Sequence, residues 1–123
     1  MAEYYSTGAL QQKSYVFALR IVKAYKYLTD NQEYVIAKQL LRSGTSIGAN
    51  CRESKNAQST LDFVSKLNIA LKEADETAYW LELLHDGGFI SEESFTSIHK
   101  DCIELVKLLT TIIKTTKNKL LDK

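Results

Sequence analysis

The pattern closest to a metal-binding or catalytic motif is Glu82 followed three residues later by His85, a Glu-x-x-His pair in a helical segment. Di-iron carboxylate bundles need two such pairs and two further carboxylates that face inward. The other histidine, His99, has Thr96 three residues before it, so the second pair is missing. We therefore expect no metal and no cofactor, and we expect His85 to lie at the surface near a helix end.

Cys51 and Cys102 are the remaining candidates for a nucleophile. A catalytic thiol needs a nearby base and a lowered pKa, and neither cysteine has an adjacent histidine. Both fall on apolar stripes, which predicts small buried side chains in a reducing compartment. Gly87-Gly88 lacks the lysine of a phosphate-binding loop and indicates a helix stop. The sequence thus offers no catalytic residues.

Charge is distributed unevenly along a chain whose net charge is only +1. Residues 1–58 hold eight Lys or Arg against four Asp or Glu, whereas residues 59–90 hold two against six. If the second and third helical segments turn back on each other near residue 57 or 58, Arg42 lies opposite Glu73 and close to Glu76. The same register places Arg52 near Asp62.

This register suggests a partly buried ion pair between Arg42 and either Glu73 or Glu76, with Asn50 hydrogen-bonded in the same interface. The alternative is an exposed Arg42 that contacts an anion.

Basic residues with interleaved tyrosines are also typical of nucleic-acid binding. The cations concerned lie in the first helical segment (Lys13, Arg20 and Lys23, near Tyr15, Tyr25 and Tyr27) and at the end of the fourth (Lys114, Lys117 and Lys119). A net charge of +1 does not by itself predict a polyanionic partner. An oligomer would repeat these cations around its axis and build a stronger positive surface.

Helical segments must position all these residues. Apolar residues recur at spacings of three and four over residues 10–29, 33–56, 60–86 and 91–120, and proline is absent. The breaks between the segments are short, which predicts one all-α domain, residues 1–123, with the antiparallel up-down-up-down order of a four-helix bundle. The second segment is expected to continue through Gly44 and Gly48. Asp30 or Asn31, Ser59 and Ser91 are the expected N-terminal caps.

The fourth segment carries a second apolar seam, formed by Ile103, Val106, Ile113 and Leu120. Either other copies of the chain cover this seam, or it widens the core face. No stretch approaches the ~20 apolar residues of a membrane span, and the first 15 residues lack the basic and apolar regions of a secretory signal. We expect a cytoplasmic protein that does not contact the membrane.

Residues 41–50, Leu-Arg-Ser-Gly-Thr-Ser-Ile-Gly-Ala-Asn, with Arg52-Glu53 after them, resemble the central signature of the bacterial four-helix-bundle proteins. These are also called ribosomal RNA intervening-sequence proteins. Residues 63–77 and 79–84 resemble the family's third helix, and residues 15–28 and 104–116 its first and fourth. Cys51 departs from the pattern, because an aromatic or aliphatic residue is more usual there.

The resemblance implies an antiparallel four-helix bundle that assembles as a homopentamer, a tapered barrel with a central channel, and it implies no catalytic activity. The accessory protein of diversity-generating retroelements is similar in fold and binds nucleic acid, but it is strongly basic, which this chain is not.

We therefore expect a non-enzymatic oligomeric bundle that acts as an interaction or scaffold module. Its signature residues are assigned to helix packing and subunit contacts: Arg42, Ser46, Asn50, Arg52 and Glu53, with Glu73 and Glu76 as partners. The alternative is an RNA- or DNA-binding accessory protein that uses the cations of the first segment and the C-terminal lysines.

Overall fold

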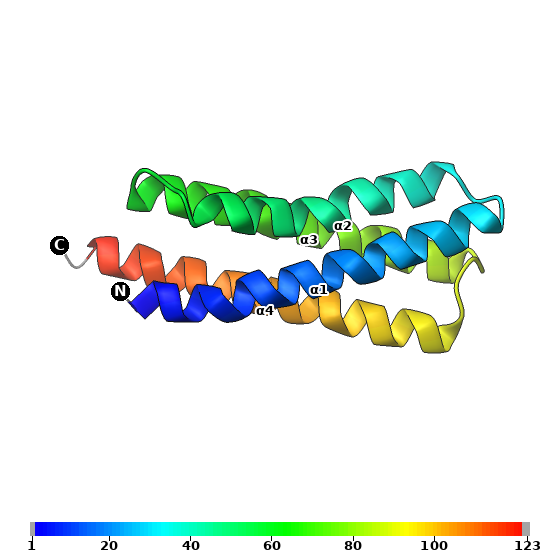
Figure 1. Ribbon diagram of the computed structural model, residues 1–123. Coiled ribbons are helices and arrows are strands. Elements are labelled where there is room, and N and C mark those ends of the chain that lie inside the picture. The colour runs from blue at the N-terminus through cyan, green and yellow to red at the C-terminus, as the bar shows by residue number, and fades with distance from the viewer. Residues whose placement is uncertain (1, 122–123) are drawn as a thin grey trace.

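The computed structural model describes residues 2–121, and these form four helices and no strand. The helices are α1 (Ala2–Asp30), α2 (Val35–Ser54), α3 (Thr60–Asp86) and α4 (Glu92–Leu121). They run up and down along one long axis, and both chain ends lie at the same end of the bundle (Figure 1). Along this described stretch the expected all-helical single domain is confirmed. None of its helices is long and apolar enough to span a membrane.

The helix bounds differ most from expectation at the N-terminus, where α1 begins at Ala2 rather than near residue 10. Residues 2–9 lack the apolar periodicity on which the prediction relied, but they hold no proline and continue the helix. At its other end, α2 stops at Ser54, two residues earlier than expected. It continues through Gly44 and Gly48 as the sequence predicts.

Side-chain caps fix three of the helix starts. Ser59 accepts a hydrogen bond from the Asp62 backbone N–H (3.0 Å), and Ser91 accepts one from Ser94 (3.1 Å). Neither Asp30 nor Asn31 caps α2, because both belong to the end of α1 and its turn. The N-cap residue of α2 is Tyr34, whose side chain makes no cap hydrogen bond, and the preceding Glu33 supplies one instead: its carboxylate accepts from the Ile36 backbone N–H at 2.6 Å.

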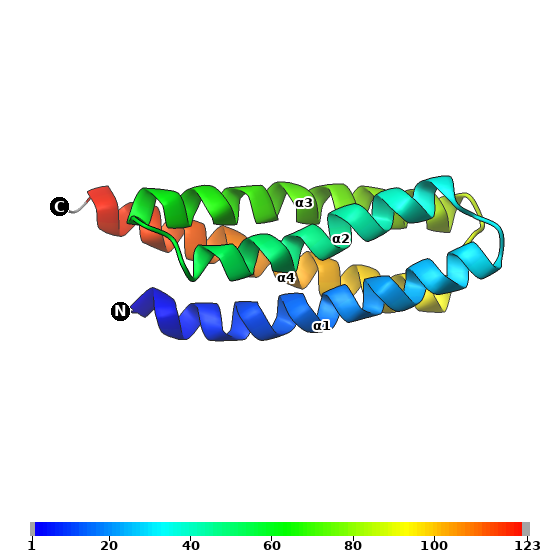
Figure 2. The same ribbon diagram turned by 45° about the horizontal axis from the view of Figure 1, so that its top comes forward.

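The helices pack in a ring in which each lies beside the next in sequence and α4 closes against α1. Figure 2 shows α2 between α1 and α3, with α4 behind them. Fully buried leucine, isoleucine and phenylalanine side chains from all four helices fill the centre: Leu10, Phe17, Ile21, Leu28, Leu40, Ile47, Leu67, Leu81, Leu84, Leu105 and Leu109. The ring is uneven, since α1 packs more extensively against α2 than against α4.

The second seam of α4 does not form the exposed face that one alternative required. Ile113 is buried, and Ile103, Val106 and Leu120 are half-buried. A helix packed between two neighbours buries a face wider than one seam, and for this reason the second seam of α4 is largely buried within one copy. The large exposed apolar side chains lie mainly on α1 and α3 instead.

Gly44 sets the close approach of α1 and α2. A Cβ atom at this position would lie 2.7 Å from Cγ1 and 2.8 Å from Cγ2 of Ile21, whose side chain is fully buried. One turn later, a Cβ at Gly48 would lie 3.3 Å from the Ser14 carbonyl oxygen. Ile21 therefore occupies the space that a side chain at Gly44 would need.

We expect Gly44→Ala to lower the free energy of unfolding by about 1–3 kcal/mol, because overpacking a core costs that much and the gain in helix propensity is only about 1 kcal/mol. The matched control is Gly8→Ala, where a Cβ has no neighbour within 4 Å. Urea denaturation should show that variant as stable as the parent chain or more stable. Equal effects of the two substitutions would contradict the close approach.

Candidate functional site

The best-connected polar cluster joins α2 to α3 around Arg42. Its guanidinium lies 3.0 Å, Nη1 to Oε2, from Glu73 and also pairs with Glu76. The Trp80 indole N–H donates to Oε2 of Glu76 at 2.9 Å. Glu73, Glu76 and Trp80 are spaced three and four residues apart, so one face of α3 presents all three to α2.

The electrostatics of this cluster favour the charged forms. The Trp80 indole N–H, and after it Arg42, hold the pKa of the Glu76 carboxyl below its usual range. The hydrogen bond to Glu76 is likewise the main reason that the pKa of Arg42 is raised. The Arg42 side chain is 48% exposed, against 17% for Glu73. Each ion pair is therefore expected to contribute only about 0.2–1 kcal/mol to the free energy of unfolding. The cluster joins α2 to α3.

Two other signature residues of α2, Ser46 and Asn50, bond within their own helix. Ser46 donates to the Arg42 carbonyl oxygen at 2.6 Å, and Asn50 donates to that of Ser46 at 2.8 Å. The prediction that Asn50 hydrogen-bonds within the interface that holds Arg42 is therefore wrong. Short polar side chains often bond to the carbonyl four residues earlier in their own helix, and both residues do so here.

The expected position of Arg52 beside Asp62 is also wrong. Arg52 lies on the rim of a hollow with Gln11 and Tyr15, on the α1 side of α2. With about 3.6 residues per turn, the residue ten positions after Arg42 points about a quarter turn away from it, and the eleventh returns to the same face. That eleventh residue is Glu53, whose Oε1 lies 3.7 Å from Lys66 Nζ of α3.

A buried polar contact between α2 and α3 has no counterpart among the predicted residues. The hydroxyl oxygens of Ser43 and Thr77 lie 3.0 Å apart, and Thr77 also donates to the Glu73 carbonyl oxygen at 2.7 Å. Both side chains are fully buried. The sequence did hold one signal for this contact, because Ser43 and Thr77 both lie on the apolar stripes of their helices.

The two cysteines are free thiols buried in the core. Burial raises the pKa of the Cys51 thiol to about 11 and that of the Cys102 thiol to about 12. A reactive cysteine needs the opposite shift. The Cys102 Sγ donates to the Ala74 carbonyl oxygen at 3.3 Å.

The histidines lie where α3 ends and α4 begins. Phe95 stacks between the two imidazole rings, with ring centroids 4.3 Å from His85 and 4.7 Å from His99. His85 pairs with Glu92, and His99 Nε2 lies 2.9 Å from Glu82 Oε2. Among the described side chains, those of residues 8–121, no three His, Cys, Asp or Glu form a group that could hold a metal ion.

The candidate nucleic-acid residues are spread over the bundle. Lys13 pairs with Glu104, and Arg20 lies 2.6 Å from Asp101. Lys23 is exposed in the second half of α1. The C-terminal cations, Lys114, Lys117 and Lys119, are exposed along the last turns of α4, toward the end of the bundle where the termini lie (Figure 1). The structure does not gather these six residues into one patch.

Trp80 is the only tryptophan, so its fluorescence reports on Glu76. A folded-state pKa below the unfolded one means that the carboxylate stabilises the fold above the unfolded pKa, near 4.3, and that this contribution is lost as pH falls through the lower folded value. We expect the fluorescence transition to have its midpoint below pH ~4.3.

The matched variant is Glu76→Gln, which keeps the size of the side chain and should abolish the transition. Far-UV circular dichroism over the same range shows whether the helices stay intact. A midpoint above that of an ordinary glutamate, or an unchanged transition in Glu76→Gln, would refute the assignment.

Comparisons with known proteins agree on one family. Residues 9–111 match the model of the 23S rRNA-intervening sequence protein family. A crystal structure of a protein of unknown function from the S23 ribosomal protein family of Bacteroides thetaiotaomicron is 55% identical and superposes with a TM-score of 0.87, covering 89% of this chain and 98% of that one. No curated protein matches the chain. The four helices, the Arg42 cluster and these matches lead to one conclusion: the chain belongs to the 23S rRNA-intervening sequence protein family.

Proposed function

We propose that the protein is a non-enzymatic, cytoplasmic helical-bundle protein that assembles with copies of itself and acts as an interaction or scaffold module. One observation carries this proposal: two apolar stripes face outward on different helices. The α1 stripe consists of Tyr15, Leu19 and Val22, and the α3 stripe consists of Ile69, Tyr79 and Leu83. Each of these six side chains is 38–58% exposed.

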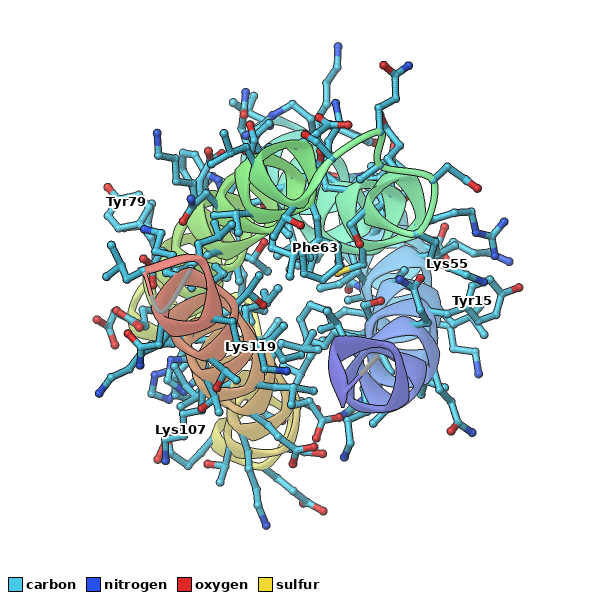
Figure 3. All side chains as sticks on the ribbon, turned by 90° about the vertical axis from the view of Figure 1, so that its left-hand side faces the viewer. Tyr15, Lys55, Phe63, Tyr79, Lys107 and Lys119 are labelled. Carbon is cyan, nitrogen blue, oxygen red and sulfur yellow. The ribbon has the colours of Figure 1, made fainter. Side chains whose placement is uncertain are left out.

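The two stripes suit contact between copies because they lie on different sides of the bundle. Tyr15 and Tyr79 project outward from opposite sides when the molecule is viewed along its axis (Figure 3). A contact of the α1 stripe of one copy with the α3 stripe of the next would be heterologous, and such contacts close into a ring when the rotation allows. The family resemblance gives five as the expected number of copies.

Charge supports the same pairing. Lys26 continues the α1 stripe, four residues after Val22, and it is exposed. Along the exposed side of α3 three acids, Asp75, Glu82 and Asp86, outnumber one cation, Lys72. Complementary charge of this kind speeds association and selects the partner surface more than it adds affinity.

The alternative function, RNA or DNA binding, has less support from the described residues. Lys13 and Arg20 already face carboxylates, which reduces the positive field along α1. A binding assay over a range of salt concentrations separates the two functions, since phosphate contacts make affinity fall steeply as salt rises. Such a slope would favour the alternative, and absence of binding at low salt would remove it.

Sedimentation equilibrium tests the proposal. We expect the parent chain to have about five times the 13.9 kDa mass of one copy. Leu19→Glu should reduce the mass to that of one copy with the helices intact, because it places a charge inside an apolar contact. The control is Val35→Glu, which changes an exposed apolar residue at the start of α2, outside both stripes. A parent chain that sediments as a single copy, or an unchanged mass in Leu19→Glu, would overturn the proposal.

A further inference from the structure

A hollow of about 450 Å³ opens between α1 and α4 near the connection between α3 and α4. It lies where the ring of helices is least tightly closed. Buried side chains from the other helices form its back, among them Leu40 of α2, Leu84 of α3 and Ile98 of α4. Sites for small molecules have volumes of about 300–1,000 Å³ and are mostly apolar with a few placed polar groups.

The rim of the hollow is positively charged. Arg20 and Lys23 of α1 line one side, and Ser91, just before α4, and Ser94, in its first turn, line the other. No Asp or Glu is among the described side chains that line it. Arg20 is held by Asp101 and Ser97, whereas Lys23 makes no ion pair with the side chains of residues 8–121. Lys23 is therefore the cation available to a ligand.

We propose that this hollow binds a small organic anion with an apolar body, such as an arylalkyl carboxylate. The anionic group pairs with the Lys23 ammonium and accepts hydrogen bonds from the serine hydroxyls across the opening. The apolar body lies against the leucine and isoleucine side chains behind them. A neutral ligand would leave the charge of Lys23 unused, and a purely polar anion would leave the apolar wall in water.

This site is independent of the proposed self-association. Tyr15, Leu19 and Val22 do not line the hollow, and Tyr15 lines a different one beside α2. Failure of the solution-mass experiment would therefore leave this inference standing, and the reverse also holds.

The probe is 4-phenylbutyrate, with 4-phenylbutanol as the uncharged analogue of the same body. Both are titrated into the 123-residue chain, and binding is followed by amide chemical shifts in relaxation-optimised NMR spectra. We expect saturable shifts for the butyrate at Lys23, Ala24 and Ser94. The alcohol and the Lys23→Gln variant should each bind about tenfold more weakly, the effect of losing one charge-assisted hydrogen bond.

Two further variants sharpen the test. Lys26→Gln removes the same charge one turn later on α1, outside the hollow, and should bind like the parent chain. Ala24→Phe fills the hollow and should abolish binding; if that variant does not fold, Lys23→Gln decides alone. Shifts that fail to saturate, shifts centred elsewhere, equal binding of acid and alcohol, or equal effects of Lys23→Gln and Lys26→Gln would each overturn the inference.

Discussion

The packing of Ile21 into the space above Gly44 is the constraint on which the arrangement of α1 depends. Because Gly44 has no side chain, the buried Ile21 can approach α2 to within the distances at which a Cβ would clash. The contact draws α1 toward α2 and fixes its rotation about its own axis. It thereby directs Tyr15, Leu19 and Val22 outward and leaves α1 less tightly packed against α4, where the hollow opens.

Polar side chains add contacts between neighbouring helices of the bundle. The Arg42 cluster joins α2 to α3, and the ion pairs of Lys13 and Arg20 join α1 to α4. Cations used in this way are partly neutralised inside one copy. The outward apolar stripes remain for contact with other molecules, and of the three candidate cations of α1, Lys13, Arg20 and Lys23, only Lys23 has no carboxylate partner among the side chains of residues 8–121. For this reason we propose recognition of a second copy and of an organic anion over recognition of a polyanion.

Much of the fold could be predicted from the sequence, because helical spacing, short breaks and serine caps act locally. Ser59 and Ser91 cap the helices that the sequence assigned to them, and Arg42 meets both acids placed opposite it. The errors at Asn50 and Arg52 have a local cause. Both residues share the signature of Arg42, but at about 3.6 residues per turn their side chains point in other directions around α2, which the hairpin register did not take into account. The burial of the second α4 seam, by contrast, depends on how the two neighbouring helices pack against it.

A double-mutant cycle between Ile21→Ala and Gly44→Ala tests the central packing claim most directly. If Ile21 fills the space that a side chain at Gly44 would need, the two substitutions compensate each other. The free energy of unfolding of the double variant should then exceed the additive expectation by about 0.5–3 kcal/mol, the range for residues in direct contact. Additive effects within about 0.3 kcal/mol would contradict the account, because distant and independent sites behave in that way.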